Sequence, residues 1–160
     1  MQGSNIRAIA LDVDGTLTDG SFWWSESGEE FKQFHYLDVM GISRAMRLGI
    51  VFALISGEDS PLVSRFAAKL KIETVYRGCK DKASALTEFA QASSLDLHEI
   101  CFMGDDINDL PALRIAGLAA APPTAHEAVL ACAAFVATRP AGKGAVRSLI
   151  DHLWGDRINV

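Results

Sequence analysis

The chain has 160 residues, of which 49% are hydrophobic and 22% are charged. This balance is typical of a globular protein and excludes a disordered or fibrous one. The formal net charge is −5, from 20 acidic and 15 basic residues, so we expect no nucleic acid partner. In this acidic overall field an anionic substrate needs a local positive site, and a bound divalent cation would supply one.

No hydrophobic run approaches the roughly 18 residues that a membrane-spanning helix needs, so we expect no membrane partner. The start of the chain, Met1 to Asn5, is polar, and we expect no secretory signal there. The three cysteines are an odd number and widely spaced, without a CxxC pair, which argues against structural disulfides and a zinc site. We therefore expect reduced thiols and a cytoplasmic protein.

Hydrophobic segments of strand length alternate with segments of helical period, which favours a parallel sheet flanked by helices. The expected strands are 6–13, 50–55, 74–76, 100–103, 117–121 and 134–137. The expected helices are 39–48, 59–70, 81–92, 107–115, 125–131 and 144–153. Asp59 is the expected N-cap of the second helix, with Pro61 in its first turn. The fold class is therefore α/β, a Rossmann-like parallel sheet with helices on both faces, in a single domain over residues 1–160.

Residues 20–36 interrupt this alternation between the first strand and the first helix. Two short strands around the turn at 25–28 predict a β-hairpin. Its aromatic residues Phe22, Trp23, Trp24 and Phe31 would be exposed on an isolated hairpin, which is marginally stable in water. We therefore expect the hairpin to need a partner, such as the same hairpin of another subunit.

Polar side chains gather at the predicted carboxyl ends of three strands, where ligands bind in open parallel sheets. These residues are Asp12, Asp14, Thr16, Ser56, Gly57, Asp105, Asp106, Asn108 and Asp109. Three or four carboxylates in one crevice repel one another unless a cation neutralises them. Because hard oxygen ligands suit magnesium, which also binds substrate phosphate, the set predicts a Mg²⁺ site. Any single one of these acids could instead be a turn or helix-capping residue.

Four motifs, in this order and spacing, resemble those of the haloacid dehalogenase superfamily of phosphatases. They are Asp12-x-Asp14-Gly15-Thr16, Ser56, Lys82 and Gly104-Asp105-Asp106-x-Asn108-Asp109. The resemblance spans nearly the whole chain and implies a hydrolase of phosphoric monoesters. A lysine such as Lys82, taken alone, would more often be a solvated surface residue.

The resemblance also implies a role for each residue. Asp12 would be the nucleophile that forms an aspartyl-phosphate, and Asp14 the general acid and base. Asp12, Asp105 and the backbone carbonyl of Asp14 would bind Mg²⁺. Asp106, Asn108 and Asp109 would support these ligands. Ser56 and Lys82 would hold the transferring oxygens where negative charge develops.

Because the hairpin is the one insertion and there is no room for a large cap domain, the chain resembles the capless branch of this superfamily. That branch acts on phosphorylated 2-keto-3-deoxy sugar acids in lipopolysaccharide or sialic acid biosynthesis. The implied substrate is 3-deoxy-D-manno-octulosonate 8-phosphate or the nine-carbon 2-keto-3-deoxynononate (sialate-type) 9-phosphate. The branch also implies a homotetramer assembled through the hairpins. The expected substrate-binding residues are Thr16, Gly57, Glu58, Lys69 and Asp38.

The chain departs from the branch pattern at His35, where members have Asn, and at Phe66, where members have Arg. Glu58 and Lys69 match the nine-carbon enzymes, so the substrate prediction leans to nine carbons, although both could lie on a solvated helix face. Two alternatives stay open. One is a phosphatase of this superfamily with another small phosphomonoester as substrate. The other is a catalytically quiet domain that oligomerises through the hairpin and scaffolds a sugar-nucleotide synthetase.

Overall fold

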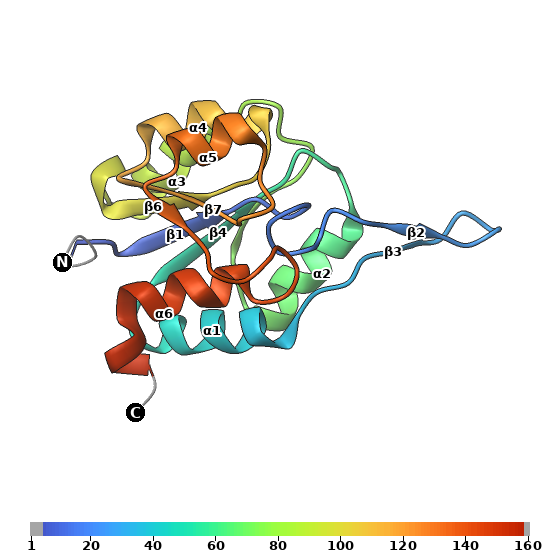
Figure 1. The fold of residues 1–160 in the computed structure, drawn as a ribbon, viewed down its shortest axis with the longest axis horizontal. Helices are drawn as coiled ribbons and strands as arrows, with labels where there is room; N and C mark the ends of the chain where they lie inside the picture. Colours follow the sequence, from blue (N-terminus) through green and yellow to red (C-terminus); the bar gives the residue numbers. More distant parts are fainter. Residues whose placement is uncertain (1–4, 159–160) are drawn as a thin grey trace.

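The computed structural model describes residues 5–158, and six parallel strands form its central sheet (Figure 1). The spatial order of the strands is β5-β4-β1-β6-β7-β8. Their bounds are β1 (Ala8–Leu11), β4 (Val51–Ile55), β5 (Thr74–Tyr76), β6 (Ile100–Met103), β7 (Leu118–Ala121) and β8 (Phe135–Val136). The polar start of the chain, Met1 to Asn5, for which no secretory signal is expected, lies outside the described residues except for Asn5.

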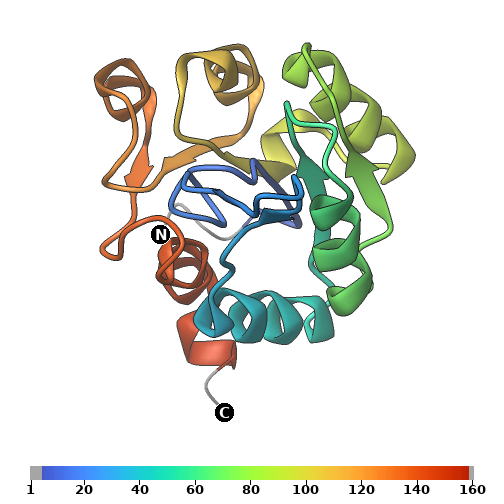
Figure 2. The same ribbon diagram turned by 90° about the vertical axis from the view of Figure 1, so that its right-hand side faces the viewer.

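Helices cover both faces of the sheet, as Figure 2 shows. One layer contains α1 (Tyr36–Arg47), α2 (Pro61–Leu70) and α6 (Ala145–Ile158), and the other contains α3 (Lys82–Ala92), α4 (Leu110–Ile115) and α5 (Glu127–Cys132). Side chains alternate along β1, so Ile9 and Leu11 pack in the first layer while Ala8 and Ala10 pack in the second. The predicted three-layer α/β fold is confirmed.

Most element ends differ by a few residues from the sequence expectation. Helix α1 begins at Tyr36, three residues early, because Nδ1 of His35 accepts a backbone hydrogen bond from the first turn at 3.2 Å. The expected helix at 107–115 divides into a 3₁₀ turn, Ile107–Asp109, and the short helix α4. Helix α6 continues past its expected end across a non-helical residue, Trp154.

The expected N-cap of α2 is wrong. Ser60, not Asp59, is the N-cap, and its Oγ accepts a hydrogen bond from the backbone N–H of Leu62 at 3.3 Å. The carboxylate of Asp59 instead pairs with Nε of Arg77 at 3.4 Å. Serine and aspartate cap helices about equally well, so the position relative to the first helical residue determines which of the two is the N-cap. Because Pro61 occupies the first helical position, the cap is the residue directly before it.

The predicted hairpin projects from the body of the molecule, and it ends before Tyr36, which is the first residue of α1 (Figure 1). Its strands are β2 (Trp23–Trp24) and β3 (Glu30–Phe31), paired antiparallel. The turn is closed by a backbone hydrogen bond from Gly28 to the carbonyl of Ser25 at 3.0 Å, and Gly28 has a φ of +87° that favours glycine. Trp23 and Trp24 are each 68% exposed. The hairpin aromatics therefore have little cover within this chain.

Among residues 5–158, no helix is both long enough and apolar enough to cross a membrane. The three cysteines, Cys79, Cys101 and Cys132, are free thiols. Complete burial raises the pKa of the Cys101 thiol well above its ordinary value. Cys101 is therefore an inert core residue, which agrees with the expectation of unpaired cysteines.

Gly117, between α4 and β7, provides a test of the fold. Its backbone N–H donates to the carbonyl of Leu97 at 2.8 Å, and a Cβ here would overlap the backbone carbonyl of His98. Gly117→Ala should therefore lower the free energy of unfolding by about 1–3 kcal/mol, measured by urea denaturation. Gly57→Ala is the matched control, because a Cβ there meets its nearest atom at 3.7 Å. Equal midpoints for the two variants would contradict this packing.

Candidate active site

The register of the three central strands brings their carboxyl ends to one edge of the sheet. Leu11, the last residue of β1, pairs with Leu54 of β4 and with Met103 of β6. The residues that follow these strands therefore emerge side by side and line a cleft of about 240 Å³. The lining residues are Asp12, Asp14, Ser56, Gly57, Glu58, Cys79, Lys80, Asp105, Asp106 and Asn108. Eight of these ten are expected site residues.

The loop after β1 is wound tightly around one carbonyl group. The carbonyl of Val13 accepts backbone hydrogen bonds from the next residues, including Leu17 at 2.9 Å and Thr18 at 3.1 Å. Gly15 has a φ of +89°, and a Cβ at this position would overlap the carboxylate of Asp105. A glycine is therefore required here both for the turn and for the close approach of the backbone to Asp105.

A buried lysine neutralises two of the carboxylates. Nζ of Lys82 lies 2.6 Å from Oδ1 of Asp12 and 2.6 Å from Oδ1 of Asp109. The Lys82 side chain is 2% exposed. Burial acts to lower the pKa of Lys82, but attraction to Asp12 and Asp109 outweighs burial, so the pKa is raised and the group stays charged. Lys82 is the N-terminal residue of α3, and that helix brings the ammonium to the end of β1.

Asp109 organises the loop that follows β6. Its Oδ2 accepts hydrogen bonds from the backbone N–H groups of Asp105 at 2.9 Å and Asp106 at 3.1 Å, while its Oδ1 holds Lys82. A Cβ at Gly104 would come within 2.5 Å of the Asp109 carboxyl carbon. Gly104 thus leaves room for a side chain that fixes both the loop and the lysine.

Three carboxylates are close enough to share one cation. Oxygen atoms of Asp12, Asp105 and Asp109 lie within 4.8 Å of one another. Burial, reinforced by Asp109 and Asp105, raises the pKa of Asp12 even though Lys82 opposes the rise. Burial also raises the pKa of Asp105 to about 6, with a hydrogen bond to Asp12 opposing the rise. Such a crowded set of hard oxygen donors, in contact with the Gly15 backbone, fits a magnesium ion.

The loop after β4 forms the opposite wall of the cleft. Oγ of Ser56 accepts a hydrogen bond from the backbone N–H of Glu58 at 3.2 Å, and the backbone carbonyl of Ser56 accepts one from Cys79 at 2.9 Å. Nζ of Lys80 donates to the carbonyl of Gly57 at 3.0 Å. Lys80 and Cys79 line the cleft but are absent from the sequence prediction, since an exposed lysine and an isolated cysteine carry no motif.

The structure does not bring Asp38 to the cleft. Its side chain is fully buried, and Oδ1 accepts a hydrogen bond from the backbone N–H of Arg147, in the first turn of α6, at 2.8 Å. Burial raises its pKa, against hydrogen bonds from the same turn. A carboxylate at a helix N-terminus is stabilised there, so the position of Asp38 indicates a link between α1 and α6 rather than a contact with substrate.

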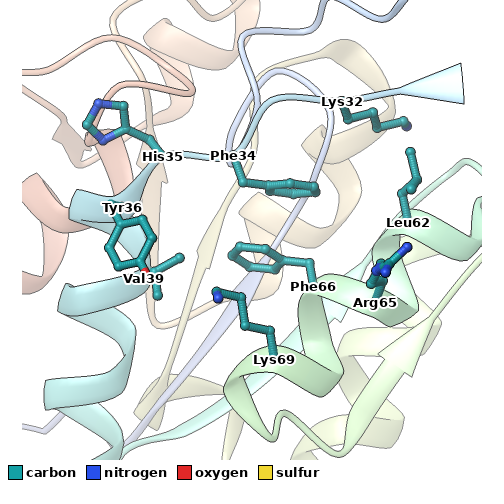
Figure 3. A pocket seen from close by; sticks show the side chains of 9 residues that line it. All are labelled: Lys32, Phe34, His35, Tyr36, Val39, Leu62, Arg65, Phe66 and Lys69. Atoms are coloured by element: carbon teal, nitrogen blue, oxygen red, sulfur yellow. The ribbon is translucent and has the colours of Figure 1, made fainter.

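Two further expected substrate-binding residues also lie outside the cleft lining. Thr16 is buried, and its Oγ1 has no hydrogen-bond partner among the described residues. Lys69 lines a different cavity, of about 470 Å³, between α1 and α2 (Figure 3). There its Nζ lies 5.6 Å from the centre of the Tyr36 ring. Gly57 and Glu58 do line the cleft.

One site residue lies in the hairpin segment and is missing from the sequence prediction. Nζ of Lys32 lies 2.8 Å from both carboxylate oxygens of Asp14 and 3.7 Å from Oε1 of Glu30. The Lys32 side chain is 3% exposed, whereas that of Asp14 is 29% exposed. A lysine among acidic and aromatic hairpin residues resembles an ordinary solvated residue, so no local pattern marks it.

Comparison with known proteins gives consistent matches. Residues 75–149 match the model of the haloacid dehalogenase-like hydrolases. The chain is 34% identical over 152 residues to the 3-deoxy-D-manno-octulosonate 8-phosphate phosphatase KdsC of Escherichia coli, covering 95% of this chain and 81% of that protein.

Solved structures resemble the whole described fold. The 3-deoxy-D-manno-octulosonate 8-phosphate phosphatase of Moraxella catarrhalis, in complex with magnesium, phosphate and KDO, superposes with a TM-score of 0.94 at 32% identity. That match covers 99% of this chain and 91% of the other. The cobalt-bound phosphatase of Haemophilus influenzae gives a TM-score of 0.93 at 33% identity, covering 97% and 91%.

The buried lysine makes a pH-dependent prediction. In Lys82→Met the carboxylates of Asp12 and Asp109 lose their counter-ion, so the variant should lose about 3–5 kcal/mol of unfolding free energy at about pH 8. Without Lys82 the folded-state pKa of Asp12 rises further above its unfolded value. Ionisation then costs the folded state more, and the loss should grow as the pH rises from about 5 to about 8.

Urea denaturation in the presence of a chelator measures this loss. Lys80→Met is the matched control, because Lys80 is exposed, and it should change the unfolding free energy by less than about 0.5 kcal/mol. A loss for Lys82→Met that is as small as the control, or that does not depend on pH, would refute the role of Lys82 as the counter-ion.

Proposed function

Since the chain belongs to the haloacid dehalogenase-like hydrolases and is a magnesium-dependent phosphoric monoester hydrolase, we propose that its substrate is a phosphorylated 2-keto-3-deoxy sugar acid. The observation that carries this proposal is the pairing of Asp12 with Lys82 at the base of a cleft that Asp14 also lines. Together they provide a nucleophile held in place and a second carboxylate beside it.

In the proposed reaction Asp12 attacks phosphorus and becomes an aspartyl-phosphate. Lys82 holds Oδ1 of Asp12 and so fixes the orientation of the nucleophilic carboxylate. Asp12, Asp105 and the backbone carbonyl of Asp14 would hold Mg²⁺, with Asp109 fixing the Asp105 loop. The bound ion offsets the repulsion between a carboxylate nucleophile and a phosphate dianion.

Asp14 moves the protons in this proposal. It donates one to the leaving sugar oxygen as the ester bond breaks, and accepts one from the water that attacks the aspartyl-phosphate. The products are the free sugar acid and phosphate, and Asp12 is regenerated. Ser56, at the opposite wall, would donate to a phosphoryl oxygen together with Lys82. Asp106 and Asn108 line the same cleft and would orient these groups.

The relatives with matching chains are named for the eight-carbon substrate 3-deoxy-D-manno-octulosonate 8-phosphate, and we take this compound as the first candidate. The preference for the nine-carbon substrate, inferred from Glu58 and Lys69, remains a prediction. Glu58 lines the cleft, where it could contact a sugar hydroxyl, whereas Lys69 lies in the neighbouring cavity. Both compounds therefore belong in the substrate test.

Turnover of the substrate panel tests the proposal. The panel contains the eight- and nine-carbon sugar acid phosphates, simple sugar phosphates and 4-nitrophenyl phosphate, each with Mg²⁺ and with a chelator. Asp12→Asn should lower turnover by at least about 1,000-fold, since an amide cannot replace the nucleophile. Retained activity in Asp12→Asn would refute the mechanism. Equal kcat/KM for sugar acid and simple sugar phosphates would refute the substrate class.

We also propose that the active form is a homotetramer assembled through the hairpins. Support comes from Phe22 and the aromatic side chains of β2 and β3, all of which are exposed on the projecting hairpin. A cleft without a cap domain would gain exclusion of water if a neighbouring subunit covered it. The free thiols fit a reducing compartment, so we place this one-domain enzyme in the cytoplasm.

Replacing both Trp23 and Trp24 by Ser should dissociate the assembly. Each tryptophan is 68% exposed in the single chain, and the apolar area that it would bury in the proposed interface is lost in the variant. Light scattering coupled to size-exclusion chromatography measures the molar mass of the assembly. Turnover of the sugar acid phosphate should fall more than that of 4-nitrophenyl phosphate, which needs fewer contacts. Glu26→Gln, at an exposed position of the turn, is the control at the hairpin tip. A fully active wild-type monomer would rule out the tetramer.

A further inference from the structure

We infer that Lys32 is a positioning residue for the reaction, holding the carboxylate of Asp14 in the orientation that proton transfer requires. This inference rests on the proposed function, in which Asp14 exchanges protons with the leaving group and with water. It adds a cation from the hairpin segment to a site otherwise built from the loops after the strands and the start of α3.

The geometry sets Lys32 apart from an ordinary surface lysine. Its Nζ lies 2.8 Å from each oxygen of Asp14, so one ammonium holds both oxygens. The other side-chain hydrogen bond to Asp14 in the described part of the chain comes from Oγ1 of Thr18, at a long 3.5 Å. That same Oγ1 accepts hydrogen bonds from the backbone N–H groups of Gly15 and Gly20. Lys32 is therefore the dominant contact that orients Asp14.

The burial of Lys32 strengthens this contact. Its side chain is 3% exposed, so the ammonium is shielded from water and the ion pair is weakened little by salt. Oε1 of Glu30, in β3, lies 3.7 Å from the ammonium, beyond hydrogen-bond distance, and gives it a second anionic neighbour. A long flexible lysine side chain is thus confined to one position, which a solvated lysine would not be.

Lys32 also connects one cavity with a residue of the other. Its side chain lines the cavity between α1 and α2, beside the stacked rings of Phe34 and Phe66 whose centres are 4.2 Å apart (Figure 3). Its ammonium reaches Asp14, which lines the catalytic cleft. Because Lys32 directly follows β3, a shift of the hairpin base would move the ammonium and with it the Asp14 carboxylate.

Asp14 needs this restraint because proton transfer depends on the position of its carboxyl group. A proton donor must lie within hydrogen-bond reach of the leaving oxygen while the phosphorus–oxygen bond breaks. An Asp14 side chain released from Lys32 would spread over several rotamers, and a small displacement of a catalytic group costs much rate. The loss should be large for an alkyl ester, whose leaving oxygen needs the proton, and small for 4-nitrophenyl phosphate, whose leaving group does not.

The test compares kcat/KM for these two classes of ester. The alkyl ester is the one in the substrate panel that the wild type hydrolyses fastest. Lys32→Met should lower kcat/KM for the alkyl ester by about 10- to 100-fold, and for 4-nitrophenyl phosphate by less than about threefold. Lys32→Arg, which keeps the charge, should recover most of the alkyl ester activity. Lys143→Met, an exposed lysine outside the cleft lining, is the matched control and should change neither.

A double-mutant cycle with Asp14→Asn separates positioning from general damage. If Lys32 acts through Asp14, Lys32→Met should have no further effect on the alkyl ester once Asp14 is already Asn. Equal losses for both esters, or additive losses in the cycle, would overturn the inference and leave the proposed function intact. A wild type without magnesium-dependent activity on any ester would instead refute the proposed function, and the inference with it.

Discussion

The interaction on which this site depends is the buried ammonium of Lys82 between Asp12 and Asp109, at 2.6 Å from each. Without it, carboxylates at the ends of β1 and β6 would repel one another in a place shielded from water. Asp109 then extends the effect, since its other oxygen binds the backbone of the loop that carries Asp105. One cation from the start of α3 therefore holds together two loops that the sheet only brings near each other.

The two aspartates of the loop after β1 are held from opposite directions. Asp12 is paired with Lys82 of α3, whereas Asp14 is paired with Lys32 beside the hairpin. Gly15, between the loop and Asp105, lets the backbone approach the carboxylates closely. The proposed nucleophile is thus held from the core, and the proposed proton-transfer group from a projecting element. In a covalent mechanism, the position of the attacking carboxylate would then be fixed. The position of the second carboxylate would depend on the contacts that the hairpin makes.

Much of the fold and most of the cleft could be predicted because their signals are local. Apolar runs such as 50–55 and 100–103 contain the largely buried strands β4 and β6, and polar residues directly after them must emerge at one edge of a parallel sheet. Element ends were harder to place, since Ser60 and Asp59 are equally good caps and a histidine cap on α1 has no strong sequence signal. The local sequence therefore does not determine which of two neighbouring residues is the cap.

The sequence by itself determined the alternation of strands and helices, the cluster of acids at the strand ends and the hairpin with its exposed aromatic residues. Only the tertiary structure decided that Lys32 binds Asp14, that Asp38 is buried against the first turn of α6, and that Lys69 faces another cavity. The physical reason is distance along the chain. Periodicity reports which face of an element is buried, whereas a charged side chain takes its partner from whichever element the packing brings within hydrogen-bond reach.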